Sequence, residues 1–241
     1  MRKLLALAAL VLGLASCQTE PEGLDVNVGG EVDTVVTVSL PETETRAADS
    51  AEGAFVNVVN SEEYTIRYIL QVYYGSTAAP QQVIYSDEKS VSFPVRLVSG
   101  RTYSFVAWAD VAKKNDQGEW EAMHYNTANL EAVTFNDNWN AMDETFDAFT
   151  DVKTVVYNGT TGFNLNLTRP FAKLRVLTTD MIALNNLGIV PDGVYVKYNV
   201  PVYDKFDALS GNVITTSSID EKVFAATILS ISSIGIASPV W

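Results

Sequence analysis

The stretch YTIRYILQVYY, residues 64–74, indicates the fold class of this chain. Apolar or aromatic residues occupy every even position from Tyr64 to Tyr74, and Thr65, Arg67 and Gln71 lie between them. Because side chains of a β-strand point alternately to opposite faces, this period of two is typical of a strand with one buried face. Residues 64–74 are therefore predicted to form a long strand with Thr65, Arg67 and Gln71 on the face opposite the apolar residues.

The same alternation recurs along most of the chain, and turn residues such as Ser99-Gly100 and Asn158-Gly159 separate the runs. The further runs are residues 91–97, 103–109, 163–167, 172–176 and 194–200. No alternation of strands with helices is visible, which argues against a parallel α/β sheet. We therefore predict an all-β protein of antiparallel Greek-key β-sandwiches, with short helices at Leu130–Ala132 and Thr179–Leu187.

The N-terminus has the pattern of a secretory leader. Arg2 and Lys3 precede an apolar run over residues 4–14, which ends in Leu14-Ala15-Ser16-Cys17. A cysteine at this place resembles the bacterial lipoprotein signal, in which the leader is cleaved before the cysteine and acyl chains such as palmitate are attached. We expect residues 1–16 to be a signal peptide and Cys17 to be lipidated, so that acyl chains hold the mature protein at a membrane.

A tether and a first strand are predicted next. Residues 17–31 are polar and lack periodicity, which is typical of a flexible linker. Alternation begins within residues 32–40, where Val36, Val38 and Leu40 are predicted to face the core, and a proline follows at position 41. Residues 42–53 are small and polar, the composition of an exposed loop that proteases can reach.

Composition and candidate chemistry argue against nucleic-acid binding and catalysis. The 241 residues have a formal net charge of −13, which repels nucleic acid. His124 is the only histidine and has no nucleophile motif beside it, so we predict a satisfied or solvent-facing side chain. Zinc sites need three or four histidine or cysteine ligands. We therefore predict a non-enzymatic protein without cofactor or metal.

An acidic cluster is the strongest remaining candidate for catalysis. Paired acids can cleave a glycosidic bond. The spacing of four between its aspartates instead favours a solvated face of one helix, or an acidic loop. The cluster consists of Asp143, Glu144, Asp147 and Asp151.

Several motifs together resemble a known family. After the lipoprotein signal, the tether and the first strand comes the loop Thr45-Arg46-Ala47-Ala48. Further along lie YSFVAWA at 103–109, LTRPFAKLRV at 167–176 and VPVYDKFDALSG at 200–211. Over most of residues 17–212 the chain resembles the fimbrillin-like surface lipoproteins of the Bacteroides lineage. The resemblance implies two transthyretin-like β-sandwich domains, here residues 32–160 and 161–241.

The resemblance also implies a function. Members of that family are type V pilus subunits or related surface proteins, and a trypsin-like protease cuts them after an arginine behind the first strand. Arg46, followed by Ala47, matches that position, although it equally suits an ordinary loop arginine. Loss of the first strand, here residues 32–40, opens a groove that a strand of a neighbouring subunit fills.

The expected protein is thus a fimbrial subunit or adhesin. It would be lipid-anchored and surface-exposed at the cell outer membrane, or part of a fimbrium. Its partners would be other pilin subunits or a host surface ligand. A rival interpretation is a monomeric glycan-binding surface lipoprotein in which Trp120, Trp139 and Tyr125 stack on sugar rings.

The C-terminal run departs from the family pattern. Residues 223–241 carry no charge, but their serines and threonines argue against a membrane-spanning helix. The sequence leaves open whether Trp241 is a natural or a truncated end. A truncated end would leave the second domain incomplete.

Overall fold

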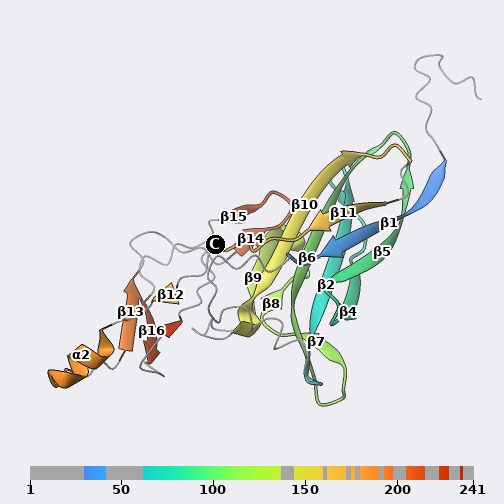
Figure 1. Cartoon of the computed structure of the whole chain (residues 1–241). Coiled ribbons are helices and arrows are strands. Elements are labelled where there is room, and N and C mark those ends of the chain that lie inside the picture. The colour runs from blue at the N-terminus through green and yellow to red at the C-terminus, as the bar shows by residue number, and fades with distance from the viewer. Residues whose placement is uncertain are drawn as a thin grey trace, which may run out of the picture.

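The computed structural model describes ten segments of the chain. Cys17, Arg46 and Ala47 lie outside these segments, so the predicted lipidation and cleavage sites remain predictions. The described segments are residues 30–41, 62–136, 144–159, 162–171, 175–176, 180–189, 193–197, 205–214, 223–227 and 234–235. Strands dominate them, and the predicted all-β class is confirmed (Figure 1).

Two sheets face each other across the main core (Figure 1). The first, termed the β1 sheet, has the order β11-β1-β5, with β1 at Glu31–Ser39, β5 at Ser90–Val98 and β11 at Gly162–Asn166. The second, termed the β2 sheet, has the order β10-β6-β2, with β3 and β4 on β2 and β7 on β6. Its strands are β2 (Tyr64–Tyr74), β3 (Thr77–Ala78), β4 (Gln82–Ser86), β6 (Thr102–Lys114), β7 (Trp120–Ala122) and β10 (Ala148–Val156).

The period-two pattern explains the main core. In β5, the residues Val91, Phe93, Val95 and Leu97 are buried, whereas the residues between them are exposed. The predicted strand at 64–74 coincides with β2, and the runs at 91–97 and 103–109 lie within β5 and β6. Each strand therefore contributes one apolar face to a common core, as the alternation predicts.

A third sheet covers the outer face of the β2 sheet. This cover sheet has the order β15-β14-β9-β8, and the 3₁₀ helix η1 (Leu130–Ala132) precedes β9. Its strands are β8 (Tyr125–Asn126), β9 (Val133–Phe135), β14 (Lys205–Asp207) and β15 (Asn212–Ile214). Leu130, Val133 and Phe206 pack with Ile69 and Trp108 in a second core.

The face of β2 that carries Thr65 and Arg67 is therefore covered as well. Thr65 and Arg67 are buried, because the cover sheet and the residues around it close over the outer face of β2. The short helix predicted at Leu130–Ala132 is present as η1, and α2 at Met181–Asn186 lies within the predicted helix at 179–187.

The predicted domain boundary at residues 160 and 161 does not match the strand pairing. β11 pairs with β1, and β14 pairs with β9 through Lys205 opposite Thr134 and Phe206 opposite Val133. Residues 162–171 and 205–214 therefore belong to the same unit as residues 30–136. The reason is that their apolar side chains, including Leu165 and Phe206, complete its two cores.

The remaining described elements form small separate pairs. β12 (Arg175–Val176) pairs with β17 (Ile234–Gly235), and β13 (Gly193–Lys197) pairs with β16 (Val223–Thr227). The charge-free C-terminal run thus supplies two strands. Among the described residues, no helix is long and apolar enough to cross a membrane.

Candidate functional site: the β1 slot

β1 has a hydrogen-bonded neighbour on each edge. Its nine residues, Glu31–Ser39, pair antiparallel with Val98–Ser90 of β5. On the other edge, Val35–Ser39 pair parallel with Gly162–Asn166 of β11. The pairing continues past the strand end, where the amide of Leu40 donates to the carbonyl of Lys89 at 2.9 Å. We term the space that β1 occupies between β5 and β11 the β1 slot.

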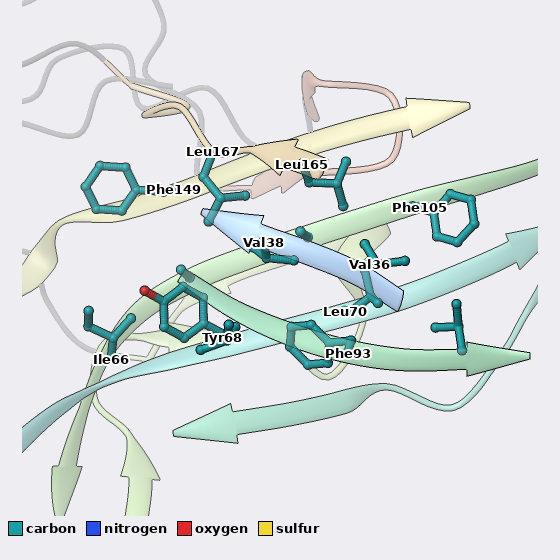
Figure 2. Close-up of a cluster of buried hydrophobic side chains, with 14 of the residues drawn as sticks. Val36, Val38, Ile66, Tyr68, Leu70, Phe93, Phe105, Phe149, Leu165 and Leu167 are labelled. Carbon is teal, nitrogen blue, oxygen red and sulfur yellow. The ribbon is translucent and has the colours of Figure 1, made fainter. Parts of the chain in front are cut away.

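The inward face of β1 is mainly apolar, with Thr34 as a buried polar residue on it. Val36 and Val38 are 0% exposed, and Val32 and Leu40 pack against the same cluster as partly buried residues. Figure 2 shows Val36 and Val38 within the cluster that Phe93 of β5 and Leu165 of β11 help to form. Full burial of a valine side chain contributes about 1.5–3 kcal/mol relative to exposure. The structure thus brings together the three residues predicted to face the core, with Leu40 at its margin.

The outward face of β1 is polar and loosely bound. Asp33 accepts a hydrogen bond from Nε of Arg96 at 2.8 Å, and Ser39 and Ser90 share one at 2.9 Å. The hydrogen bond from Arg96, together with its charge, holds the pKa of Asp33 below its ordinary value. Exposed pairs of this kind contribute little to stability. The inward valines and the two backbone ladders therefore provide most of the hold on β1.

Gly162 allows the close approach of β11 to β1. A Cβ atom at this position would lie 3.1 Å from the carbonyl oxygen of Val35, which the ladder fixes in place. We expect Gly162→Ala to lower the free energy of unfolding by about 1 kcal/mol, because the paired backbone cannot move aside. Urea denaturation measures the change. Gly30→Ala is the matched control, because nothing lies within 4 Å of its Cβ position. Equal effects of the two substitutions would contradict the expectation.

His124 is a buried core residue and does not face solvent, the second of the two states predicted for it. Its side chain is buried, Nε2 lies 2.6 Å from Oγ1 of Thr145, and its ring stacks on Phe146 with the ring centres 3.6 Å apart. Among the described residues, no group of three or more histidine, cysteine, aspartate or glutamate side chains could hold a metal ion.

The acidic cluster does not form one solvated helix face. Asp147 is buried and binds Arg169 through two hydrogen bonds, of 2.7 and 2.6 Å. Asp151 lies in β10 and accepts a hydrogen bond from the amide of Asn166 at 3.0 Å. Glu144 begins the 3₁₀ helix η2 (Glu144–Phe146), and Asp143 lies outside the described residues. Asp147 and Asp151 are thus structural partners of Arg169 and Asn166.

The glycan-binding interpretation requires Trp120, Trp139 and Tyr125 to be exposed so that they can stack on sugar rings. Tyr125 is 1% exposed, and its hydroxyl donates to the carbonyl of Phe146. Trp120 is half-buried, stacks with Tyr85, and has Nζ of Lys114 4.7 Å from its ring centre. Trp139 lies outside the described residues. Tyr125 therefore cannot stack on a sugar, which weakens the glycan-binding interpretation.

Sequence reasoning missed the ion pair in the second core. Nε and Nη2 of Arg67 donate to Asp110 at 2.8 and 2.6 Å, and both residues are buried. The available signal was a lone acid inside the apolar run of β6. A buried charge requires a partner, but the pairing of Asp110 with Arg67 follows only from the register of β2 and β6.

The facing sheets and the β1 slot define the class of this chain, an all-β sandwich protein whose first described strand is internal to its sheet. The chain belongs to a family of unknown function, DUF6562, whose model matches residues 25–234. No curated protein and no solved structure matches it.

Proposed function

We propose that this protein is a lipid-anchored structural protein of the cell surface, a fimbrial subunit or adhesin that assembles by β-strand exchange. The observation that supports this most is the position of β1. It is the first described strand, it lies between β5 and β11, and two fully buried valines bind it to the core. An incoming strand could form the same two ladders and fill the same apolar sites.

Cleavage after Arg46 would leave β1 bound only by noncovalent contacts. Cys17 and β1 both lie on the N-terminal side of Arg46, so they would remain on one fragment. Departure of that fragment would free the rest of the chain from the proposed lipid anchor and open the β1 slot. Proteolysis would thus couple release from the outer membrane to readiness for assembly.

The second core is suited to survive this loss. Its buried residues come from the β2 sheet, the cover sheet and the segments beside them, and none of the residues described in it belongs to β1. The β2 sheet is therefore packed on its outer face independently of β1. The slot could stand open between cleavage and strand entry while the packing of the second core persists.

Limited trypsin digestion of the full chain tests the proposal. We expect an early cut after Arg46, seen by intact mass, followed by displacement of β1 and by oligomers on gel filtration. A labelled peptide of residues 30–41, supplied in excess, should enter the slot of the cut protein and suppress the oligomers.

Two variants sharpen this experiment. Arg46→Gln should abolish the cut and the oligomers together, whereas Arg101→Gln, at an exposed turn residue, should leave both unchanged. A cut protein that keeps its β1 fragment and stays monomeric at every concentration would contradict strand exchange. Absence of the cut would contradict Arg46 as the maturation site.

A further inference from the structure

We propose that the β1 sheet admits an additional chain only at the β1 slot, because side chains block both of its outer edges. The inference rests on the proposed strand exchange and adds the route by which it occurs. A partner would replace β1 in the middle of the sheet and would not add beside β5 or β11. An open strand edge is a template for any extended chain, so natural sheets commonly protect their edges with proline, lysine or other charged residues.

On the β5 edge, Pro94 and Gln82 provide the block. The carbonyl oxygen of Pro94 accepts a hydrogen bond from Nε2 of Gln82 at 3.1 Å, so this carbonyl points away from β1. Within a strand, the N and O atoms of one residue point to the same edge. Proline has no N–H, so at this position the outer edge of β5 lacks a donor and its acceptor is already occupied.

On the β11 edge, β10 provides the block. Just past the end of β11, the backbones of Thr168 and Thr150 exchange two hydrogen bonds, of 2.8 and 3.0 Å, and two charged side chains of β10 occupy the edge before that point. Oδ2 of Asp151 accepts the amide hydrogen of Asn166 at 3.0 Å. Two residues earlier on β11, Nζ of Lys153 lies 3.5 Å from the carbonyl oxygen of Asn164 and 5.8 Å from the ring centre of Phe163. The outward backbone groups of Asn164 and Asn166 thus have side-chain partners, and a desolvation cost opposes any chain that would displace these charges.

These contacts also indicate the chemistry of the partner. A segment that replaces β1 must be extended and must present small apolar side chains at two alternate positions, where Val36 and Val38 now lie. At the position of Val35 its backbone must pass Gly162 at close range. A partner segment with apolar side chains on both faces would find no free backbone partners at either blocked edge.

Opening the edges by substitution tests the inference on the uncut chain. One variant, Asp151→Thr with Lys153→Thr, opens the β11 edge without changing the net charge, and Gln82→Thr with Pro94→Val opens the β5 edge. All samples carry Cys17→Ser, so that acyl chains cannot drive association. We expect concentration-dependent oligomers by light scattering for both opened variants and a monomer for the parent.

Matched controls remove the same residue types elsewhere. Glu63→Thr with Lys113→Thr deletes an exposed ion pair of 3.0 Å, and Pro80→Val with Gln117→Thr changes exposed residues outside the strands. Both controls should remain monomeric. Opened variants that melt like the parent and stay monomeric would overturn the inference, as would controls that associate to the same extent.

Amide hydrogen exchange on the parent protein gives a test that needs no substitution. The amide of Asn166 faces β10, where the side chain of Asp151 and not a backbone carbonyl accepts its hydrogen bond, so it should exchange slowly. Exchange at the rate of an unstructured amide would overturn the block at this edge. Because none of these measurements involves cleavage, failure of Arg46 processing would leave them unchanged and would count only against the proposed function.

Discussion

Replacement of Val36 by aspartate is expected to lower the free energy of unfolding by about 3–5 kcal/mol, a large part of the stability of a typical domain. Val36 is 0% exposed and lies in the main core with Phe93, Phe105 and Leu70 (Figure 2). A carboxylate at this position would be removed from water without a partner. Urea denaturation followed by tryptophan fluorescence measures the shift.

The neighbouring residue provides the control. Val35 lies on the opposite face of the same strand and is 38% exposed. Val35→Asp introduces the same charge one residue away, and we expect a change within about 0.5 kcal/mol. Equal shifts for the two variants would show that the inward face of β1 does not hold the strand. Val36→Asp in the peptide of residues 30–41 should abolish the entry of the peptide into the slot of the cut protein.

Removal of the carboxylate of Asp110 is expected to cost about 3–5 kcal/mol, because it leaves the Arg67 guanidinium buried without its counter-ion. Burial lowers the pKa of Arg67, but the charge and hydrogen bonds of Asp110 outweigh it, so the net pKa is raised. Arg67 is 8% exposed, and Asp110 is 1% exposed and also accepts a hydrogen bond from Nε1 of Trp108 at 2.9 Å. Asp110→Ala therefore removes the acceptor of three hydrogen bonds in the second core, two from Arg67 and one from Trp108.

An exposed pair again provides the comparison. Glu63→Ala breaks the contact with Lys113, whose nitrogen lies 3.0 Å from the carboxylate at the surface. Solvent screens such pairs, so we expect no measurable change in the urea midpoint. If Asp110→Ala were as mild, the buried pair would not be a main source of stability in the second core. Thermal melting of Asp110→Ala, followed by tryptophan fluorescence, should also begin at a lower temperature than that of the parent.

The substitutions of Val36 and Asp110 test the main core and the second core, respectively. Val36 belongs to the core that β1 closes, and Asp110 to the core that β1 does not touch. A protein that exchanges β1 needs the second core to remain intact in the interval. We therefore expect two separate requirements for peptide entry after cleavage. Asp110 in the cut protein keeps the second core folded, and Val36 in the peptide fills the apolar site of the slot.

The sequence alone determined which residues of the long strands face the main core. A period of two is a local property of the chain, and it placed Val36 and Val38, the central even positions 66, 68 and 70 of β2 and the buried residues of β5 correctly, whereas Tyr74 at the end of β2 is 50% exposed. The sequence also located η1 and α2, but not η2. The first strand was predictable as an element, although Leu40 is only partly buried and the burial of Thr34 was not predicted.

Only the tertiary structure decided what lies next to what. The parallel pairing of β1 with β11, the burial of β2 on both faces and the union of Arg67 with Asp110 join residues far apart in the sequence. Period-two patterns are equally compatible with many partners, so they could not show that residues 205–214 complete the first unit. Nor could they distinguish the acids at positions 147 and 151 from a helix face, because Asp147 and Asp151 acquire their roles from Arg169 and Asn166. Long-range packing selects among the pairings that local patterns permit, and it placed β1 between two strands whose outer edges are occupied.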